Sequence, residues 1–141
     1  MKIIAETKIP APINVVWRAF NDPDDILQWD TSDEWHTIKA SNDLKVGGLL
    51  ELRIEAIDGK SGFDFAATYT RIELNRLIEW RQMDDDRLIR VEFSENGAGT
   101  VVRQTFNADP KIPSDEERAD WQGVLDNFGR HVAKKHGAQP A

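Results

Sequence analysis

Residues 121–132 read WQGVLDNFGRHV, and this stretch decides the fold of the chain. Its apolar side chains recur at helical spacing, at Trp121, Val124, Leu125, Phe128 and Val132. Residues three and four apart share one face of an α-helix, so the pattern predicts a helix with one hydrophobic side. We expect this helix to begin at Ser114, because Glu117 three residues later completes a capping-box pattern. It should end near Lys135, which makes it about 33 Å long.

Segments with the two-residue alternation of β-strands precede this helix. The alternation is clearest in residues 50–56, where apolar residues hold the even positions and charged residues the odd positions between them. The other segments of this kind are residues 2–9, 35–40, 63–74, 77–83, 89–93 and 101–106. Hairpin signals separate some of them, as in Asp58-Gly59-Lys60. Short strands at regular spacing with tight turns predict a curved antiparallel sheet.

Two short helical segments follow the first strand. Pro12 stands where a helix can begin, and apolar residues at helical spacing then predict an amphipathic helix over residues 12–20. Asp22 can cap a second helical turn that starts with Pro23. We therefore expect a single α+β domain over residues 1–141, with a core over residues 2–135 and a flexible tail at 136–141.

The composition is that of a one-domain, cytoplasmic, soluble protein. Of 141 residues, 40% are hydrophobic and 30% charged, and none is cysteine. No apolar run approaches the roughly 20 residues that cross a bilayer, and the N-terminus lacks a signal-peptide pattern, so no membrane insertion is expected. The net charge of -7 disfavours nucleic acid as a partner.

One helix laid across one sheet cannot fill all the space beneath it, so we expect an apolar pocket between them. The residues predicted to line it are Phe20, Trp29, Trp35, Phe65, Tyr69, Trp80, Gln104, Phe106, Trp121, Leu125 and Phe128. Aromatic rings supply contact area at little cost in rotamer entropy. The alternative is that these residues only form the core, because burial needs them whatever the function.

Polar residues of the predicted strands divide into two groups. Gln104 shares its strand face with Val102 and Phe106, so its amide needs either a protein or a ligand partner. The charged residues at alternate positions are expected on the convex face, and they are Arg53, Glu55, Glu79, Arg81, Glu92 and Arg103. A register slip of one residue would turn these charges into the pocket instead.

The chain offers few groups for catalysis. His36, beside Trp35, is the single candidate general base. His131 and His136 are five residues apart, which is the wrong spacing for a metal pair on one helix face, so no metal site is expected. Nucleophile-elbow and phosphate-loop motifs are absent from the sequence, and no cofactor is expected.

In its order of motifs the chain resembles the START-like (SRPBCC) superfamily, and within it the homologues of the activator of the heat-shock protein 90 ATPase. The motifs are Ile9-Pro10-Ala11-Pro12 with Val15-Val16-Trp17, Val46-Gly47-Gly48, Arg71-Ile72-Glu73 through Arg76-Leu77-Ile78-Glu79-Trp80, Gly99-Thr100-Val101-Val102, and Trp121-Gln122-Gly123-Val124-Leu125-Asp126-Asn127-Phe128. The resemblance covers roughly residues 2–135 and implies a helix-grip fold, with a seven-stranded sheet wrapped around the long helix. Many members carry glycine where this chain has Asp120, which would place a carboxylate near the groove if it points inward.

The resemblance does not select one activity, because members include ligand carriers, cyclase-like enzymes and a chaperone activator. Our first hypothesis is a monomeric, noncatalytic protein that binds a small hydrophobic, aromatic or lipid-like molecule. A second is a cyclase- or hydrolase-like enzyme that uses His36, Asp120 or Glu55. A third is a chaperone-interacting module, although the resemblance implies that the activators have a further domain beyond these residues.

Overall fold

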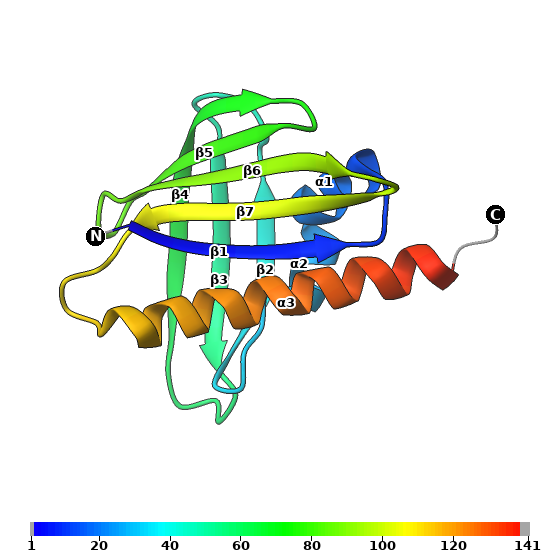
Figure 1. Ribbon diagram of the computed structural model, residues 1–141. Coiled ribbons are helices and arrows are strands. Elements are labelled where there is room, and N and C mark those ends of the chain that lie inside the picture. The colour runs from blue at the N-terminus through cyan, green and yellow to red at the C-terminus, as the bar shows by residue number, and fades with distance from the viewer. Residues whose placement is uncertain (1, 139–141) are drawn as a thin grey trace.

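The alternating segments form one seven-stranded antiparallel sheet, seen in a computed structural model that describes residues 2–138 (Figure 1). Its strands are β1 (Lys2–Ile9), β2 (Trp35–Asn42), β3 (Leu49–Ala56), β4 (Gly62–Glu73), β5 (Leu77–Gln82), β6 (Leu88–Asn96) and β7 (Gly99–Asn107). Their order in the sheet is β1-β7-β6-β5-β4-β3-β2, so the strands from β2 to β7 form a meander and β1 joins its far edge. This arrangement confirms the predicted curved antiparallel sheet.

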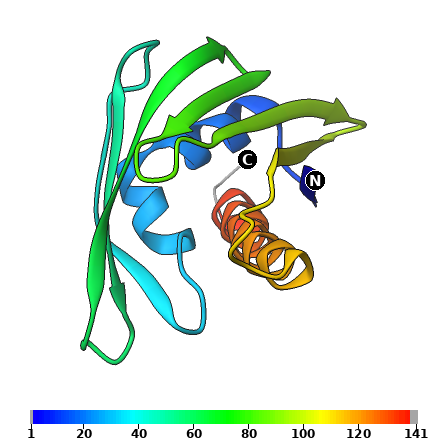
Figure 2. The same ribbon diagram turned by 90° about the vertical axis from the view of Figure 1, so that its left-hand side faces the viewer.

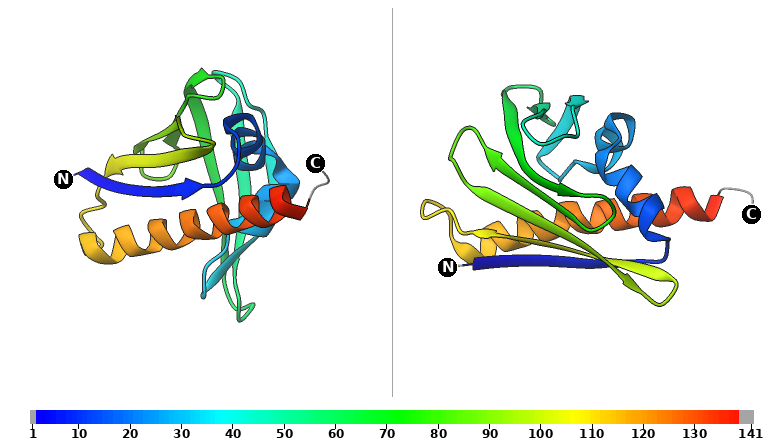
Figure 3. Two further views of the ribbon diagram at one scale, coloured as in Figure 1. Left: turned by 45° about the vertical axis from the view of Figure 1, so that its right-hand side comes forward. Right: turned by 90° about the horizontal axis from the view of Figure 1, so that it is seen from above.

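Three helices lie on the concave side of the sheet. They are α1 (Ile13–Asn21), α2 (Pro23–Trp29) and α3 (Ser114–Ala138). Seen end-on, the sheet bends around α3, while α1 and α2 occupy the same concave side (Figure 2). α3 runs alongside β1, with its far end near α1 and α2 (Figure 3). The two short helices therefore close one end of the space between the sheet and α3.

The strand register sends the charged residues outward, as predicted. On β6, Val91 and Phe93 are buried while Glu92 between them is not. On the outer face, Arg90 Nη1 donates to Glu79 Oε1 at 2.8 Å and Arg103 Nε donates to Glu6 Oε2 at 2.7 Å. Such exposed cross-strand ion pairs contribute little to stability. The register that places these ion pairs on the outer face also keeps their charges off the concave face.

An aromatic cluster joins the three helices to the sheet. Phe20 of α1 stacks on Trp29 of α2 at 5.4 Å between ring centroids. It also meets Phe128 of α3 edge-on at 5.3 Å and Phe93 of β6 at 5.5 Å. Pairs of this geometry stabilise by roughly 0.5–1.5 kcal/mol beyond their buried area. The cluster thus fixes the position of α2, which carries part of the site described below.

The ends of α3 differ from the prediction in two ways. Its C-terminal end lies at Ala138 rather than near Lys135, so residues 136–138 of the predicted tail are helical, and residues 139–141 lie outside the described residues. The predicted capping box is wrong, because Glu117 does not reach back to Ser114. Its carboxylate instead accepts hydrogen bonds from the backbone N–H of Asp109 and from Arg87. Within residues 2–138, no helix combines the length and apolar character needed to cross a bilayer.

Candidate ligand-binding site

A cavity of about 260 Å³ lies between the concave face of the sheet and the helices. The sheet contributes Asn42, Leu50, Leu52, Ile54, Phe65, Tyr69, Trp80, Gln82 and Gln104, and the helices with the residue after α2 contribute Phe20, Asn21, Ile26, Trp29, Asp30, Asp120, Trp121 and Val124. Period-two alternation explains the sheet side, since Leu50, Leu52 and Ile54 are the apolar half of β3. The space is small compared with typical ligand pockets of about 300–1,000 Å³.

Seven of the eleven residues predicted to line a pocket surround this cavity. They are Phe20, Trp29, Phe65, Tyr69, Trp80, Gln104 and Trp121. They come from six different elements, α1, α2, β4, β5, β7 and α3, so only the tertiary fold brings them together. Their contact with a ligand remains a prediction.

The other four predicted residues lie outside the cavity lining. Leu125 and Phe128 are completely or almost completely buried in the core. Phe106 is buried as well, and Trp121 packs on its ring with 4.2 Å between centroids. Trp35 lies in an adjoining surface groove, where it meets Phe63 at 5.4 Å. The geometry therefore supports a role in the hydrophobic core for Leu125, Phe128 and Phe106.

The position of His36 removes it as a base acting in the cavity. His36 pairs with Glu55 across β2 and β3, and residues directly opposite in an antiparallel pair share one face of the sheet. Glu55 alternates with the cavity residue Ile54, so Glu55 and His36 both lie on the other face. Two of the three groups considered for catalysis are therefore on the wrong side of the sheet.

Most polar groups of the cavity wall have protein partners. The hydroxyl of Tyr69 donates to Asn42 Oδ1 at 2.6 Å, and Asn42 Nδ2 donates to the backbone carbonyl of Asn21 at 2.8 Å. The indole N–H of Trp29 donates to the carbonyl of Ala19 at 3.0 Å. Burial raises the pKa of Tyr69, more than the hydrogen bond to Asn42 lowers it, so this phenol stays neutral. These bonds hold the wall rigid without offering free donors.

Two buried side chains of the cavity wall make no hydrogen bond among residues 2–138. The indole Nε1 of Trp80 is buried and unpaired, and Trp80 is 7% exposed. Gln104 is also 7% exposed and its amide makes no hydrogen bond with the described residues, but unlike Trp80 Nε1 the amide keeps some accessible surface. Gln104 was predicted to need a protein or ligand partner, and the described chain supplies no protein partner. Both residues line the cavity, and the amide of Gln104 is the one of the two polar groups that a ligand can reach.

Two carboxylates stand where the cavity meets the adjoining groove, since Asp30 and Asp120 line both. Asp30 follows the last residue of α2, and its Oδ2 accepts a hydrogen bond from Thr37 Oγ1 at 2.8 Å. Burial raises the pKa of Asp30, and the bond from Thr37 opposes this only in part. Asp120 is exposed on α3. The sequence singled out Asp120 through its departure from the family pattern, whereas no signal pointed to Asp30.

A glycine pair shapes the wall beside Tyr69. Gly47 has a φ of 84°, a conformation that side chains disfavour. A Cβ on Gly48 would lie 2.1 Å from the carbonyl oxygen of Asp43, which no side chain allows. The loop can therefore pair with β4, since Gly47 N–H donates to the Tyr69 carbonyl at 2.9 Å and Tyr69 N–H donates to Gly48 at 3.1 Å. The predicted turn at these glycines thus positions Tyr69.

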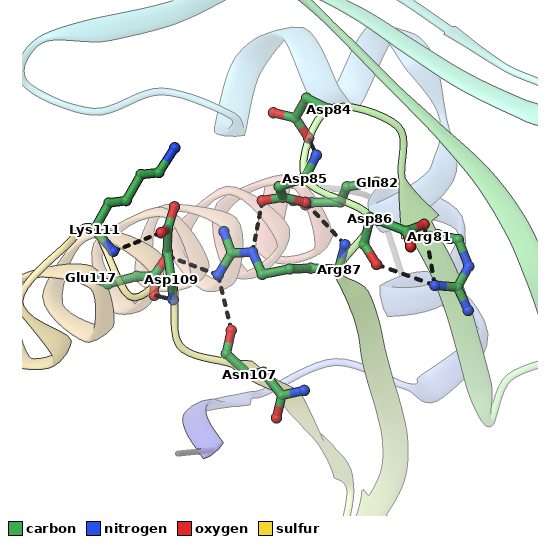
Figure 4. Close-up of polar contacts among 10 residues, drawn as sticks. All are labelled: Arg81, Gln82, Asp84, Asp85, Asp86, Arg87, Asn107, Asp109, Lys111 and Glu117. Carbon is green, nitrogen blue, oxygen red and sulfur yellow. Dashed lines mark hydrogen bonds and ion pairs between the residues drawn. The ribbon is translucent and has the colours of Figure 1, made fainter.

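The first turn of α3 is held over the sheet by a buried ion pair (Figure 4). Arg87 Nη1 donates to Glu117 Oε2 at 2.9 Å and to the carbonyl of Asn107 at 3.0 Å, while its Nε donates to Asp85 Oδ2 at 2.7 Å. The other oxygen of Glu117 accepts from the N–H of Asp109 at 2.9 Å. Glu117 precedes Trp121 by one helical turn, so this network sets the position of the cavity wall on α3.

The other end of α3 is tied to α2 through Asp25. This residue is 2% exposed, and its Oδ1 lies 2.8 Å from His131 Nε2 and 2.7 Å from Lys135 Nζ. The next residue along α2, Ile26, lines the cavity. His131 is therefore engaged by a carboxylate, and within residues 2–138 no group of three or more potential ligands is placed to hold a metal ion.

Comparison with known proteins agrees with this architecture. The family model of the Activator of Hsp90 ATPase homolog 1-like proteins matches residues 10–133. A search among curated proteins yields no match. The solution structure of the AHSA1-like protein from Aeromonas hydrophila is 40% identical, covers 100% of this chain and 97% of its own, and superposes with a TM-score of 0.88.

Two further solved structures extend the likeness. A protein from Cytophaga hutchinsonii is 32% identical over 99% of this chain and 97% of its own, with a TM-score of 0.82. A protein from Chromobacterium violaceum is only 21% identical over 94% of this chain and 98% of its own, yet its TM-score of 0.85 shows the same fold. The sheet, the long helix and the two short helices are those of the START-like helix-grip fold, and this chain belongs to the family of Activator of Hsp90 ATPase homolog 1-like proteins.

Proposed function

We propose that this protein binds a small, mainly apolar molecule in the cavity between the sheet and α3. The observation that carries the proposal is an apolar, aromatic-lined space that is also lined by Gln104, whose amide has no protein partner among the described residues. A buried polar group without a partner costs roughly 1–3 kcal/mol. A ligand that hydrogen-bonds to the Gln104 amide offsets part of that cost, so the cavity favours an occupied state.

Gln104 and the size of the cavity also describe the ligand. The indole N–H of Trp80 has almost no accessible surface, so it places no requirement on the ligand. Gln104 offers both a carbonyl oxygen and an amide N–H₂, so the polar group of the ligand can be a donor or an acceptor. With a cavity of about 260 Å³, the occupant is a compact molecule, a flat aromatic ring system with one polar group being the best match. Catalysis is not part of the proposal, because His36 and Glu55 lie on the opposite face of the sheet and leave Asp120 as the single one of the three candidate groups that lines the cavity.

A titration followed by NMR tests the proposal. Neutral one- and two-ring compounds that carry an oxygen acceptor are added to the protein, and amide and indole N–H shifts are recorded. We expect saturable shifts at Trp80, Gln104 and Trp121, with the side-chain amide of Gln104 moving most because it gains its first partner. If every compound leaves these three residues unchanged at millimolar concentration, the proposal is wrong.

The family description supports a second candidate function, an interaction with the Hsp90 ATPase. Such a contact would use an outer surface. A strip beside the cavity contains Trp35 and the 45% exposed Phe63, and it is the clearest aromatic feature of that surface. Adding the protein to purified Hsp90 and measuring ATP hydrolysis tests this candidate, with Phe63→Ser as the variant. A change in ATPase rate that Phe63→Ser abolishes would support it, and an unchanged rate would exclude it.

A further inference from the structure

The charges around the cavity are all of one sign. None of the described residues that line it is lysine, arginine or histidine, while Asp30 and Asp120 are both among them. An anionic ligand group would therefore enter an apolar space with no compensating cation and two carboxylates beside it. Burying a charge without a partner is among the most unfavourable steps in binding.

The adjoining groove extends this negative field. Asp33, Glu34 and Glu116 line it together with the two carboxylates of the cavity. Its lining contains one cation, Arg130, whose guanidinium contacts the side chain of Asn127 and which does not line the cavity itself. The protein as a whole carries a net charge of -7, so the field is not reversed at longer range.

The interior wall supplies an independent sign of a ligand. Gln104 is more than nine-tenths buried, lines the cavity and has no hydrogen-bond partner for its amide among residues 2–138. The carboxylates at the mouth and the unpaired amide of Gln104 line the same cavity. A ligand that satisfies both has an apolar body inside and a donor-rich end outside.

We propose that the occupant is an organic amine, with its apolar body between Trp80 and Trp121 and its protonated nitrogen beside Asp30 and Asp120. This inference rests on the binding function proposed above and adds the charge of the ligand. The ammonium group donates up to three hydrogen bonds and never accepts, which suits two carboxylates and excludes fatty acids and other anionic lipids. It also relieves the buried carboxyl of Asp30, which otherwise lacks an opposite charge.

Three probes with one apolar body test the charge preference, namely naphthylmethylamine, naphthylmethanol and naphthoate. Affinities are measured by calorimetry, and the Trp80 indole N–H shift shows that binding occurs in the cavity. We expect the amine to bind about tenfold tighter than the alcohol, and the carboxylate to bind at least about tenfold weaker than the alcohol. Equal affinity of the amine and the alcohol, or tighter binding of naphthoate, would overturn the charge inference while leaving the binding function intact. Failure of all three to shift the Trp80 signal would instead refute the binding function.

A pair of variants distinguishes the effect of a carboxylate at the cavity mouth from the effect of the protein's net negative charge on amine binding. Asp120→Asn removes one charge at the mouth on an exposed helix position, so the protein should fold normally. Asp115→Asn removes the same charge on the same helix, from a fully exposed side chain outside the cavity and groove. We expect Asp120→Asn to erase most of the preference for the amine over the alcohol and Asp115→Asn to preserve it. An equal effect of both variants would show that only net charge matters and would refute the proposed position of the amine.

Discussion

Arg87 and Glu117 form an ion pair at 2.9 Å that joins the turn between β5 and β6 to the first turn of α3. Glu117 is 3% exposed, and both of its oxygens accept hydrogen bonds. Arg87 also covers the ring of Phe106 at 5.5 Å. The contact thus connects the sheet, the loop before α3 and the helix at one point, directly beside the cavity residues Asp120 and Trp121.

Removing one partner of this ion pair should destabilise the folded protein. Glu117→Ala leaves the guanidinium of Arg87 with less countercharge and the N–H of Asp109 unpaired, so we expect a loss of about 3 kcal/mol in the free energy of unfolding. Urea denaturation measures it. The matched control is Glu116→Ala, an exposed neighbour that should change stability by about 0.5 kcal/mol or less. Equal effects of the two variants would contradict this role of Glu117.

The same network makes the free energy of unfolding depend on pH in the acidic range. Burial alone would raise the pKa of Asp85, but hydrogen bonds from the backbone and side chain of Arg87 and from Gln82 outweigh it and lower the pKa below its ordinary value of 3.8. Between the lowered pKa and 3.8 the unfolded chain binds more protons, so stability falls as pH falls through this window. Asp85→Asn should therefore flatten the pH dependence of the unfolding free energy below about pH 4. An unchanged slope would contradict the prediction.

Asp30 should contribute a pH dependence of stability with the opposite sign. Its pKa is raised by burial, so between the ordinary 3.8 and the raised value the folded protein binds more protons than the unfolded chain. Stability from this residue is then complete below 3.8 and is lost as pH rises through the raised pKa. Asp30→Asn keeps an oxygen to accept from Thr37 and removes the buried charge. We expect the variant to be at least as stable as the wild type at neutral pH by thermal denaturation, and a lower melting temperature would refute this.

Gln104 offers a test that separates stability from binding. Gln104→Leu replaces an unpaired buried amide with an apolar side chain of similar size, so the free energy of unfolding should rise by about 1 kcal/mol. The same change removes a hydrogen-bonding group from the cavity and should weaken ligands that use it. Gln28→Leu, at an exposed position of α2, is the control and should alter neither property. A destabilised Gln104→Leu would indicate that the amide has a partner in the folded protein.

The contact between α2 and the end of α3 depends on Asp25. Asp25→Ala removes the acceptor shared by His131 and Lys135 and should destabilise the protein by about 2–4 kcal/mol, because it leaves a buried cavity and two unpaired donors. It should also broaden the NMR signals of Ile26 and Trp29 as α2 loosens. Asp24→Ala, one residue earlier and exposed, is the control. Sharp, unshifted signals in Asp25→Ala would argue against this anchoring role.

Periodicity predicted the elements of this fold but not the contacts at their ends. The alternation in residues 50–56 and the helical spacing from Trp121 to Val132 were sufficient to predict β3 and α3, because each pattern reports which face of one element is buried. The capping box at Ser114 and Glu117 failed, since the side chain of Glu117 finds stronger partners in Arg87 and Asp109. Those partners are distant in sequence, and no local pattern records them.

The periodicity of the sequence by itself determined a curved antiparallel sheet, a long helix and the apolar face of the strands, because burial periodicity is a local property of each strand and helix, while the family resemblance implied the helix-grip fold. The tertiary structure alone decided which buried residues meet the cavity. Phe128 and Trp29 look alike in the sequence pattern, yet one is enclosed in the core and the other lines the cavity. The tertiary structure likewise placed Asp30 and Asp120 around one cavity and left the side chains of Gln104 and Trp80 without hydrogen-bond partners among the described residues, because such arrangements depend on the distances between elements that lie far apart along the chain.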